Sequence, residues 1–118
     1  MNVELFRKII ARREYVGKIS HEEWFDGIEE CWKKEIAVLS EDVRGTIEFL
    51  KTDCTASEYS WISEVIEDLA AQTQSRELVD TYKSLMAKFP EECETYNIEG
   101  SIRFAEEELG TPFDSSDK

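Results

Sequence analysis

The three cysteines and the single histidine are the side chains of this chain with the widest chemical repertoire. Cys31, Cys54 and Cys93 are odd in number and no two have the CxxC spacing, so we expect reduced thiols rather than a disulfide framework or a zinc site. A nucleophilic thiol requires a base, and His21 is the only histidine. Cys31 lies in an apolar helical pattern, which favours a small buried side chain over a catalytic one.

Carboxylates are the most abundant groups that could bind or catalyse, with 27 Asp and Glu against 14 Lys and Arg. They form no calcium-loop pattern, and the chain has no glycine-rich phosphate-binding loop. An enzyme that used neighbouring carboxylates such as Glu67 and Asp68 would need a pocket that raises their pKa values. We therefore expect a protein without enzymatic activity, cofactor or metal.

The net charge of −13 at pH 7 is unevenly distributed along the chain. Residues 1–39 carry 7 basic and 8 acidic side chains, whereas residues 40–118 carry 7 basic and 19 acidic ones. Such an excess repels nucleic-acid phosphates and anionic lipids, so we expect neither as a partner. Concentrated negative potential instead speeds the encounter with a basic protein, although solubility alone is an alternative reason for it.

Length and composition indicate one globular domain. The chain has 118 residues, of which 41% are hydrophobic. Its longest apolar run, residues 36–39, is far shorter than the roughly 20 residues of a membrane span, and Glu4 interrupts the position of a signal peptide. We expect a cytoplasmic protein with a helical domain at residues 1–110 and a frayed acidic tail at 111–118.

Apolar residues recur at helical spacing, and no strand-like alternation reaches four residues. The pattern predicts six helices, at residues 3–16, 21–38, 41–52, 56–71, 76–88 and 98–109. Pro90 ends the fifth helix and could start a short helical turn of its own. Residues of the N-cap type precede the last five helices: Ser20, Ser40, Thr55, Ser75 and Asn97.

Glutamates three residues after Ser20 and Thr55 give both sites the spacing of a capping box. Short loops between helices favour an all-α domain of antiparallel helical hairpins. Helix 41–52 with 56–71, and 76–88 with 98–109, have similar lengths, which leaves open a HEAT-like stack of two hairpins. No repeat of fixed period supports a true solenoid.

The predicted helix 56–71 is the strongest candidate for a binding surface. Its apolar face is clear, and the other face is acidic, with no lysine or arginine between Lys51 and Arg76. Tryptophan and tyrosine are common anchors in protein interfaces, although core packing is the alternative role for Trp24, Trp32 and Trp61. A solvated helix face is likewise the alternative to binding. The candidate partner-binding residues are Glu58, Tyr59, Trp61, Glu64, Glu67 and Asp68.

Residues 55–110 also resemble a known class of proteins in several short stretches: Thr73, Gln74 and Ser75 before Glu77 and Leu78; Phe89 to Glu92; Tyr96 and Asn97; Ile102; and Ala105 to Leu109. These stretches are similar to those of small helical immunity proteins from bacterial polymorphic and contact-dependent growth inhibition toxin systems. The resemblance implies an intracellular antidote that binds a sibling cell's toxin domain, often a nuclease, at or beside its active site. It supplies no motif from which individual binding residues can be transferred.

The leading hypothesis is therefore an immunity protein that neutralises a cognate toxin, expected to be a basic nuclease domain, through an acidic helical face. The alternative is a helical adaptor or scaffold domain that recruits a protein partner without inhibiting it. An adaptor would depend on an apolar groove and tolerate charge reversal along the acidic helix.

Overall fold

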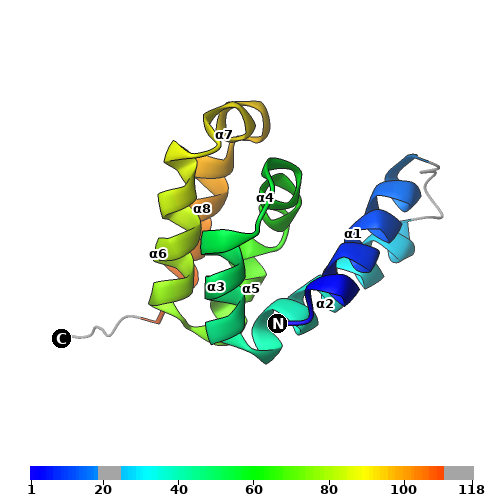
Figure 1. Ribbon diagram of the computed structural model, residues 1–118, viewed down its shortest axis with the longest axis horizontal. Coiled ribbons are helices and arrows are strands. Elements are labelled where there is room, and N and C mark those ends of the chain that lie inside the picture. The colour runs from blue at the N-terminus through cyan, green and yellow to red at the C-terminus, as the bar shows by residue number, and fades with distance from the viewer. Residues whose placement is uncertain (19–24, 111–118) are drawn as a thin grey trace.

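The computed structural model describes residues 1–18 and 25–110, which form eight α-helices, a short 3₁₀-helix and no strand (Figure 1). The all-α class expected from the sequence is confirmed for these residues. None of the described helices is both long and apolar enough to cross a bilayer. The elements are α1 (Val3–Lys18), α2 (Phe25–Glu41), α3 (Val43–Thr52), α4 (Ala56–Ile62), α5 (Ile66–Thr73), α6 (Arg76–Ser84), η2 (Leu85–Ala87), α7 (Pro90–Tyr96) and α8 (Ile98–Glu108).

The predicted helix 56–71 is wrong in one important respect, because the chain turns between α4 and α5. The backbone N–H groups of residues 63–65 bond three residues back, to the carbonyls of residues 60–62, which tightens the helix and ends it. The hydroxyls of Ser60 and Ser63 also donate to carbonyls three residues earlier. Serine side chains that compete for backbone groups in this way favour the end of a helix.

Two of the helix N-caps predicted from the sequence, Thr55 and Ser75, are confirmed. Thr55 Oγ1 accepts from the Glu58 N–H at 3.2 Å and the Glu58 carboxylate accepts from the Thr55 N–H at 3.0 Å, as the capping box predicts. Ser75 accepts from the Leu78 N–H at 3.2 Å and caps α6. Pro90 does begin a helix of its own, α7.

Two predicted caps differ from the structure, and a third, Ser20, lies outside the described residues. Ser40 is inside α2, and α3 is capped by Asp42, whose carboxylate accepts from the Gly45 N–H at 3.1 Å. The Asp42 carboxylate also accepts from the amino group of Met1 at 2.9 Å. Asn97 adopts the left-handed conformation between α7 and α8, with φ of 51°, and its side chain makes no capping bond.

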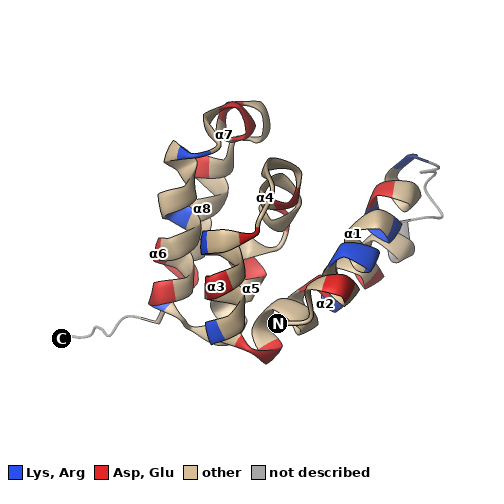
Figure 2. Cartoon of the chain, in the orientation of Figure 1, with Lys and Arg blue, Asp and Glu red and all other residues tan. Residues whose placement is uncertain are grey.

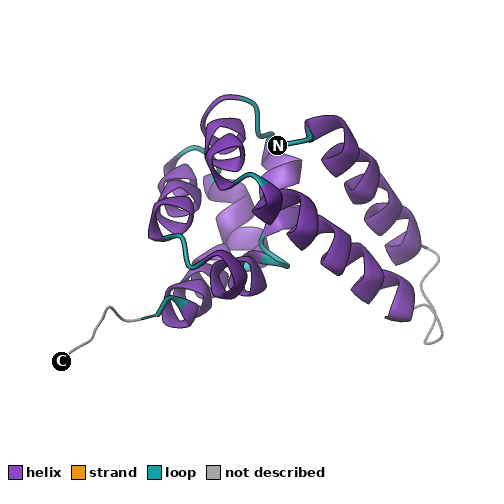
Figure 3. Ribbon diagram, turned by 90° about the horizontal axis from the view of Figure 1, so that it is seen from below, coloured by secondary structure: helices purple, strands orange, loops and turns teal. Residues whose placement is uncertain are grey.

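The helices form a long hairpin attached to a more compact body. α1 and α2 lie side by side and run in opposite directions, whereas α3 to α8 pack together beside them (Figures 1 and 3). The hairpin gives the molecule an elongated outline of 48 by 29 by 28 Å. α3 packs mainly on α6 and α5 mainly on α8, so the possible hairpin of residues 41–52 with 56–71 does not form, whereas α6 and α8, from the other possible pair, do pack on each other.

One continuous core joins the hairpin to the body. It takes buried apolar side chains from seven of the helices, including Phe6 of α1, Leu39 of α2, Ile47 of α3, Ile66 of α5 and Ile98 of α8. The rings of Phe6 and Phe49 meet edge to face with centroids 5.6 Å apart, across the boundary between hairpin and body. Burial of apolar surface therefore holds the described residues together as one globule.

A reciprocal pair of tyrosines lies at the centre of the body. Tyr82 Oη donates to the Tyr59 carbonyl at 2.7 Å, Tyr59 Oη donates to the Tyr82 carbonyl at 3.1 Å, and the rings stack at 4.3 Å. Burial raises the pKa of both phenols, so both remain protonated donors. The pair ties α4 to α6 by polar as well as apolar contacts.

We expect Tyr82→Phe to lower the free energy of unfolding by about 1–2 kcal/mol, because a buried carbonyl loses its hydroxyl donor. Urea denaturation followed by circular dichroism measures the change. The control is Tyr15→Phe, since Tyr15 is exposed and should change stability by less than about 0.5 kcal/mol. Equal effects of the two substitutions would contradict a structural role for the Tyr82 hydroxyl.

Candidate partner-binding surface

The six residues predicted to bind a partner lie in three different settings. Tyr59 is in the core and is not available on the surface. Glu58, Trp61 and Glu64 lie at the junction between α1 and α4, and Glu67 and Asp68 lie on the open surface of α5. The turn at residues 63–65 causes this separation, because it prevents the acidic side chains from sharing one helix face.

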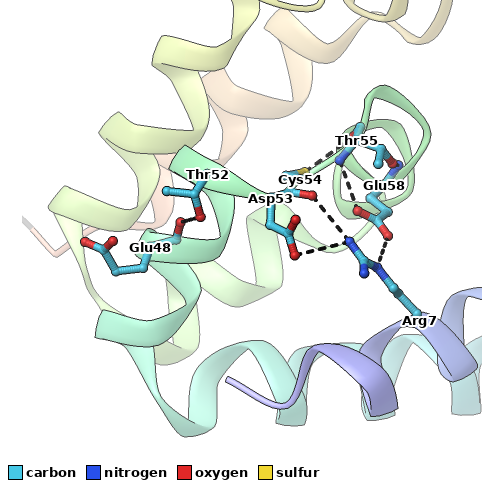
Figure 4. Close-up of polar contacts among 7 residues, drawn as sticks. All are labelled: Arg7, Glu48, Thr52, Asp53, Cys54, Thr55 and Glu58. Atoms are coloured by element: carbon cyan, nitrogen blue, oxygen red, sulfur yellow. Dashed lines mark hydrogen bonds and ion pairs between the residues drawn. The ribbon is translucent and has the colours of Figure 1, made fainter.

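Glu58 is nearly buried and serves to attach α1. Its carboxylate accepts from Arg7 Nε at 2.6 Å and, through its other oxygen, from the Thr55 N–H (Figure 4). Arg7 also reaches Asp53, at 3.3 Å to its carbonyl and 3.5 Å to its carboxylate. Burial acts to raise the pKa of Glu58, but the Arg7 guanidinium and the Thr55 N–H outweigh it and lower that pKa overall. The charge of Glu58 is therefore neutralised within the molecule.

Glu64 is the centre of a second attachment, which we call the Arg13 junction: Arg13, Trp32, Trp61 and Glu64. Arg13 donates to both Glu64 oxygens, at 3.0 and 2.7 Å, and Trp32 Nε1 donates to one of them at 2.9 Å. The Arg13 guanidinium lies 5.0 Å from the centre of the Trp61 ring, a cation–π contact. α1 and α2 are thus fixed to the body by a bidentate ion pair and an indole hydrogen bond.

Glu35 of α2 is a residue that the sequence reasoning missed. It is fully buried, and neither carboxylate oxygen has a hydrogen-bond partner among the described residues. Burial, and then the negative charge of Glu64, raise the pKa of Glu35 to about 8 although Arg13 opposes them. Its position one turn from both Cys31 and Leu39, within an apolar stripe, was the signal available in the sequence.

Exposed acidic residues occur on most of the helices (Figure 2). Those that α5 and α8 bring together form a surface that we call the α5–α8 acidic face: Glu67, Asp68, Glu107 and Glu108. Desolvation, and then the charges of its three neighbours on this face, raise the pKa of Glu67. Within the described part of the chain none of the four makes an ion pair; the ion pairs of α8 belong to Glu99 and Glu106. Like charges here repel one another without compensation.

Gln74 links the C-terminal end of α5 to the C-terminal end of α8. It caps α5 in the left-handed conformation, with φ of 52°, and its side-chain amide donates to the carbonyls of Ala71 and Glu108 at 3.0 and 2.8 Å. It also accepts from the Gly110 N–H. The C-terminal ends of two helices, each negative because of the helix dipole, therefore converge near Glu107 and Glu108, whereas Glu67 and Asp68 lie in the first turn of α5. Neither helix has a basic residue in its last turn to offset this potential.

Exposed aromatic side chains lie on α8 and at the end of α7. Phe104 is 56% exposed and lies one turn before Glu108 on α8, and Tyr96 is 57% exposed at the end of α7. A shallow pocket of about 300 Å³ lies beside them, lined in part by Trp61 and Tyr96 and by Ser101, one turn before Phe104. Exposed aromatics next to unpaired charge form a surface suited to a protein partner. Sequence reasoning did not single out Phe104, Glu107 or Glu108 as binding residues.

The described residues hold no group of three or more potential metal ligands, and none of the three cysteines is in a disulfide. Burial raises the pKa of the Cys31 and Cys54 thiols, that of Cys54 to about 12, which opposes their use as nucleophiles. The pairing of a thiol with His21, and the setting of Trp24, lie outside the described residues. No protein-family model, curated protein or solved structure matches this chain.

Proposed function

We propose that the protein is a non-enzymatic inhibitor that binds a basic cognate toxin through the α5–α8 acidic face. The observation that carries the proposal is a set of four carboxylates with no ion-pair partner among the described residues: Glu67 and Asp68 in the first turn of α5, and Glu107 and Glu108 at the end of α8. This arrangement opposes folding, because the neighbouring carboxylates repel Glu67, and Glu107 and Glu108 also lie near the negative end of the α8 dipole. A cationic partner would remove that repulsion on binding.

A nuclease domain fits the charge of this surface. An enzyme that acts on nucleic acid presents lysine and arginine where the phosphates bind, and the carboxylates of the acidic face can occupy the same positions. Phe104, exposed one turn before Glu108, supplies an apolar anchor that charged contacts lack. Glu58, Tyr59 and Glu64 already make contacts within the folded protein. The toxin is therefore expected to contact Glu67 and Asp68 of α5 together with Glu107 and Glu108 of α8.

Charge reversal of the acidic face, E67K/D68K/E107K/E108K, should abolish protection of cells that co-express the toxin encoded beside this gene. With purified proteins, the association rate should fall by about tenfold or more, because electrostatic steering is lost. The matched control E29K/E30K/E91K/E94K changes the same net charge at exposed positions and should retain protection. Added salt should slow the wild-type association and have little effect on the charge-reversed variant.

Failure of the wild-type protein to protect, or equal loss of binding in both variants, would contradict the proposal. A helical adaptor remains the second candidate function, because the hairpin carries a groove with an apolar floor between α1 and α2. An adaptor that uses this groove would tolerate reversal of the acidic face. The same pair of variants therefore separates the two functions.

A further inference from the structure

The α1–α2 hairpin has an open groove on its surface, with a volume of about 450 Å³. Its floor is apolar and includes Ile9 of α1 with Cys31 and Val38 of α2, all three buried, while the exposed Leu5 closes one end. Ile9 and Val38 of the floor also belong to the core that joins the hairpin to the body. The charged groove residues of α1, Lys8 and Arg12, differ from Arg7 and Arg13, which bind glutamates of the body, so the cations of the groove are not part of the attachment.

The rim of the groove is positively charged in a strongly negative molecule. Lys8 and Arg12 stand one turn apart on α1, and Lys34 faces them from α2. None of the three makes an ion pair within the described residues, whereas Arg7, Arg13, Arg44 and Lys83 all do.

Two of these cations line the groove together with Cys31 of its floor. Burial, and then the negative charge of Glu35, raise the pKa of the Cys31 thiol, while the positive charges of Arg12, Lys34 and Arg13 act to lower it. Arg12 also stacks on the exposed ring of Tyr15, with its guanidinium 5.6 Å from the ring centre. An apolar floor and unpaired cations thus belong to one site.

We propose that this groove binds an acidic amphipathic helix of a partner protein, whose apolar stripe lies on the floor and whose Asp and Glu side chains meet Lys8, Arg12 and Lys34. The apolar groove residues have helical spacing: Leu5 and Ile9 are four apart on α1, and Cys31 and Val38 are seven apart on α2. A third helix can pack its side chains between such rows. From Leu5 to Arg12 the groove extends about 10 Å, two turns of such a helix.

The openness of the groove favours a helix over an acyl chain or another small amphiphile. Sites for small ligands enclose most of the ligand surface, whereas this groove is open to solvent along its length. A second copy of the chain is disfavoured because each copy has a net charge of −13. This binding is independent of the proposed inhibitor function, because the groove is on a different face from the α5–α8 acidic face and its partner is acidic, whereas the toxin is basic.

The test uses a labelled, monomeric helical peptide of about 18 residues with leucines at i, i+4 and i+7 flanked by glutamates. Fluorescence anisotropy measures its binding to the full chain. We expect the peptide to bind despite the negative charge of the protein, and a twin with glutamine for every glutamate to bind about tenfold more weakly. K8E/R12E/K34E should weaken binding of the acidic peptide by more than about tenfold, and the matched control K51E/R76E/K88E by less than about twofold.

Several results would overturn the proposal. These are no binding of the acidic peptide up to about 1 mM, equal binding of its glutamine twin, and equal losses in the two triple variants. Tighter binding of dodecanoate than of the peptide, lost in K8E/R12E/K34E, would assign the groove to an amphiphile. A dimer in sedimentation that K8E/R12E/K34E disrupts would assign it to a second copy. Circular dichroism of each variant establishes that the helices are retained.

Discussion

Glu35→Met will increase the free energy of unfolding, and the increase will be about 4 kcal/mol larger near pH 9 than near pH 4. The reason is the buried carboxyl group of Glu35, which has no hydrogen-bond partner among the described residues and lies close to Glu64. Methionine has a similar volume and no charge, so it removes the cost of burying the carboxylate. Near pH 4 only the smaller cost of burying a neutral carboxyl group remains.

The sign of the pH dependence follows from the two pKa values. The folded protein holds the proton of Glu35 up to about pH 8, while the unfolded chain releases it near the ordinary value of 4.5. Between these values the unfolded state binds fewer protons, so the stability of the wild-type protein falls as the pH rises. Below the lower value, the group is protonated in both states and this contribution to instability disappears.

Urea denaturation of the two proteins across this pH range measures the effect. Glu30→Met is the matched control, because Glu30 is exposed on the same helix and should change stability by less than about 0.5 kcal/mol at any pH. A gain in stability for Glu35→Met that does not vary with pH would show that Glu35 is already ionised in the folded protein near neutral pH.

The second large effect is expected at the Arg13 junction, where Arg13→Met should lower the free energy of unfolding by about 2 kcal/mol, because the pair of Arg13 and Glu64 is bidentate and partly buried. Without the guanidinium, Glu64 keeps only the Trp32 indole as a donor and lies unneutralised near Glu35, and Trp61 loses its cation–π contact. The neighbouring substitution Arg12→Met is the control. Arg12 is exposed, pairs with no carboxylate in the described chain, and should change stability by less than about 0.5 kcal/mol.

A double-mutant cycle isolates the ion pair itself. Adding Glu64→Gln to Arg13→Met removes the unpaired carboxylate, so the double variant should be more stable than the sum of the two single losses predicts. Strict additivity, or equal effects of Arg13→Met and Arg12→Met, would mean that the bidentate contact between Arg13 and Glu64 contributes nothing to attachment of the hairpin.

Features set by near neighbours in the chain could be predicted from the sequence. The Thr55–Glu58 capping box and the Ser75 cap each need only three residues of context, and the all-α class follows from helical periodicity over the whole chain. The break at residues 63–65 was missed because the apolar residues keep helical spacing across it. Ile62 and Val65, and then Ile66 and Leu69, are buried at helical spacing on the two sides of the break.

Contacts between distant parts of the chain could not be predicted. Arg7 and Arg13 each meet a glutamate 51 residues away, and no local pattern identifies those partners. The sequence did indicate that residues 56–71 are acidic without local cations, and the cations that neutralise Glu58 and Glu64 come from α1. Recognition of the α5–α8 acidic face required knowing that α5 packs on α8.

The turn at residues 63–65 also separates two kinds of effect that substitutions in this segment would have in a position-by-position mutational scan. Substitutions at Glu58 and Glu64 would reduce the amount of folded protein in the cell, because they release the hairpin. On the proposed function, those at Glu67 and Asp68, only a few positions later, would leave abundance intact and alter affinity for the toxin. A measurement of activity alone would show loss of function at both groups of acidic residues and would not distinguish loss of folded protein from loss of binding. Recording cellular abundance beside activity for every variant separates them, and the boundary should fall at the turn.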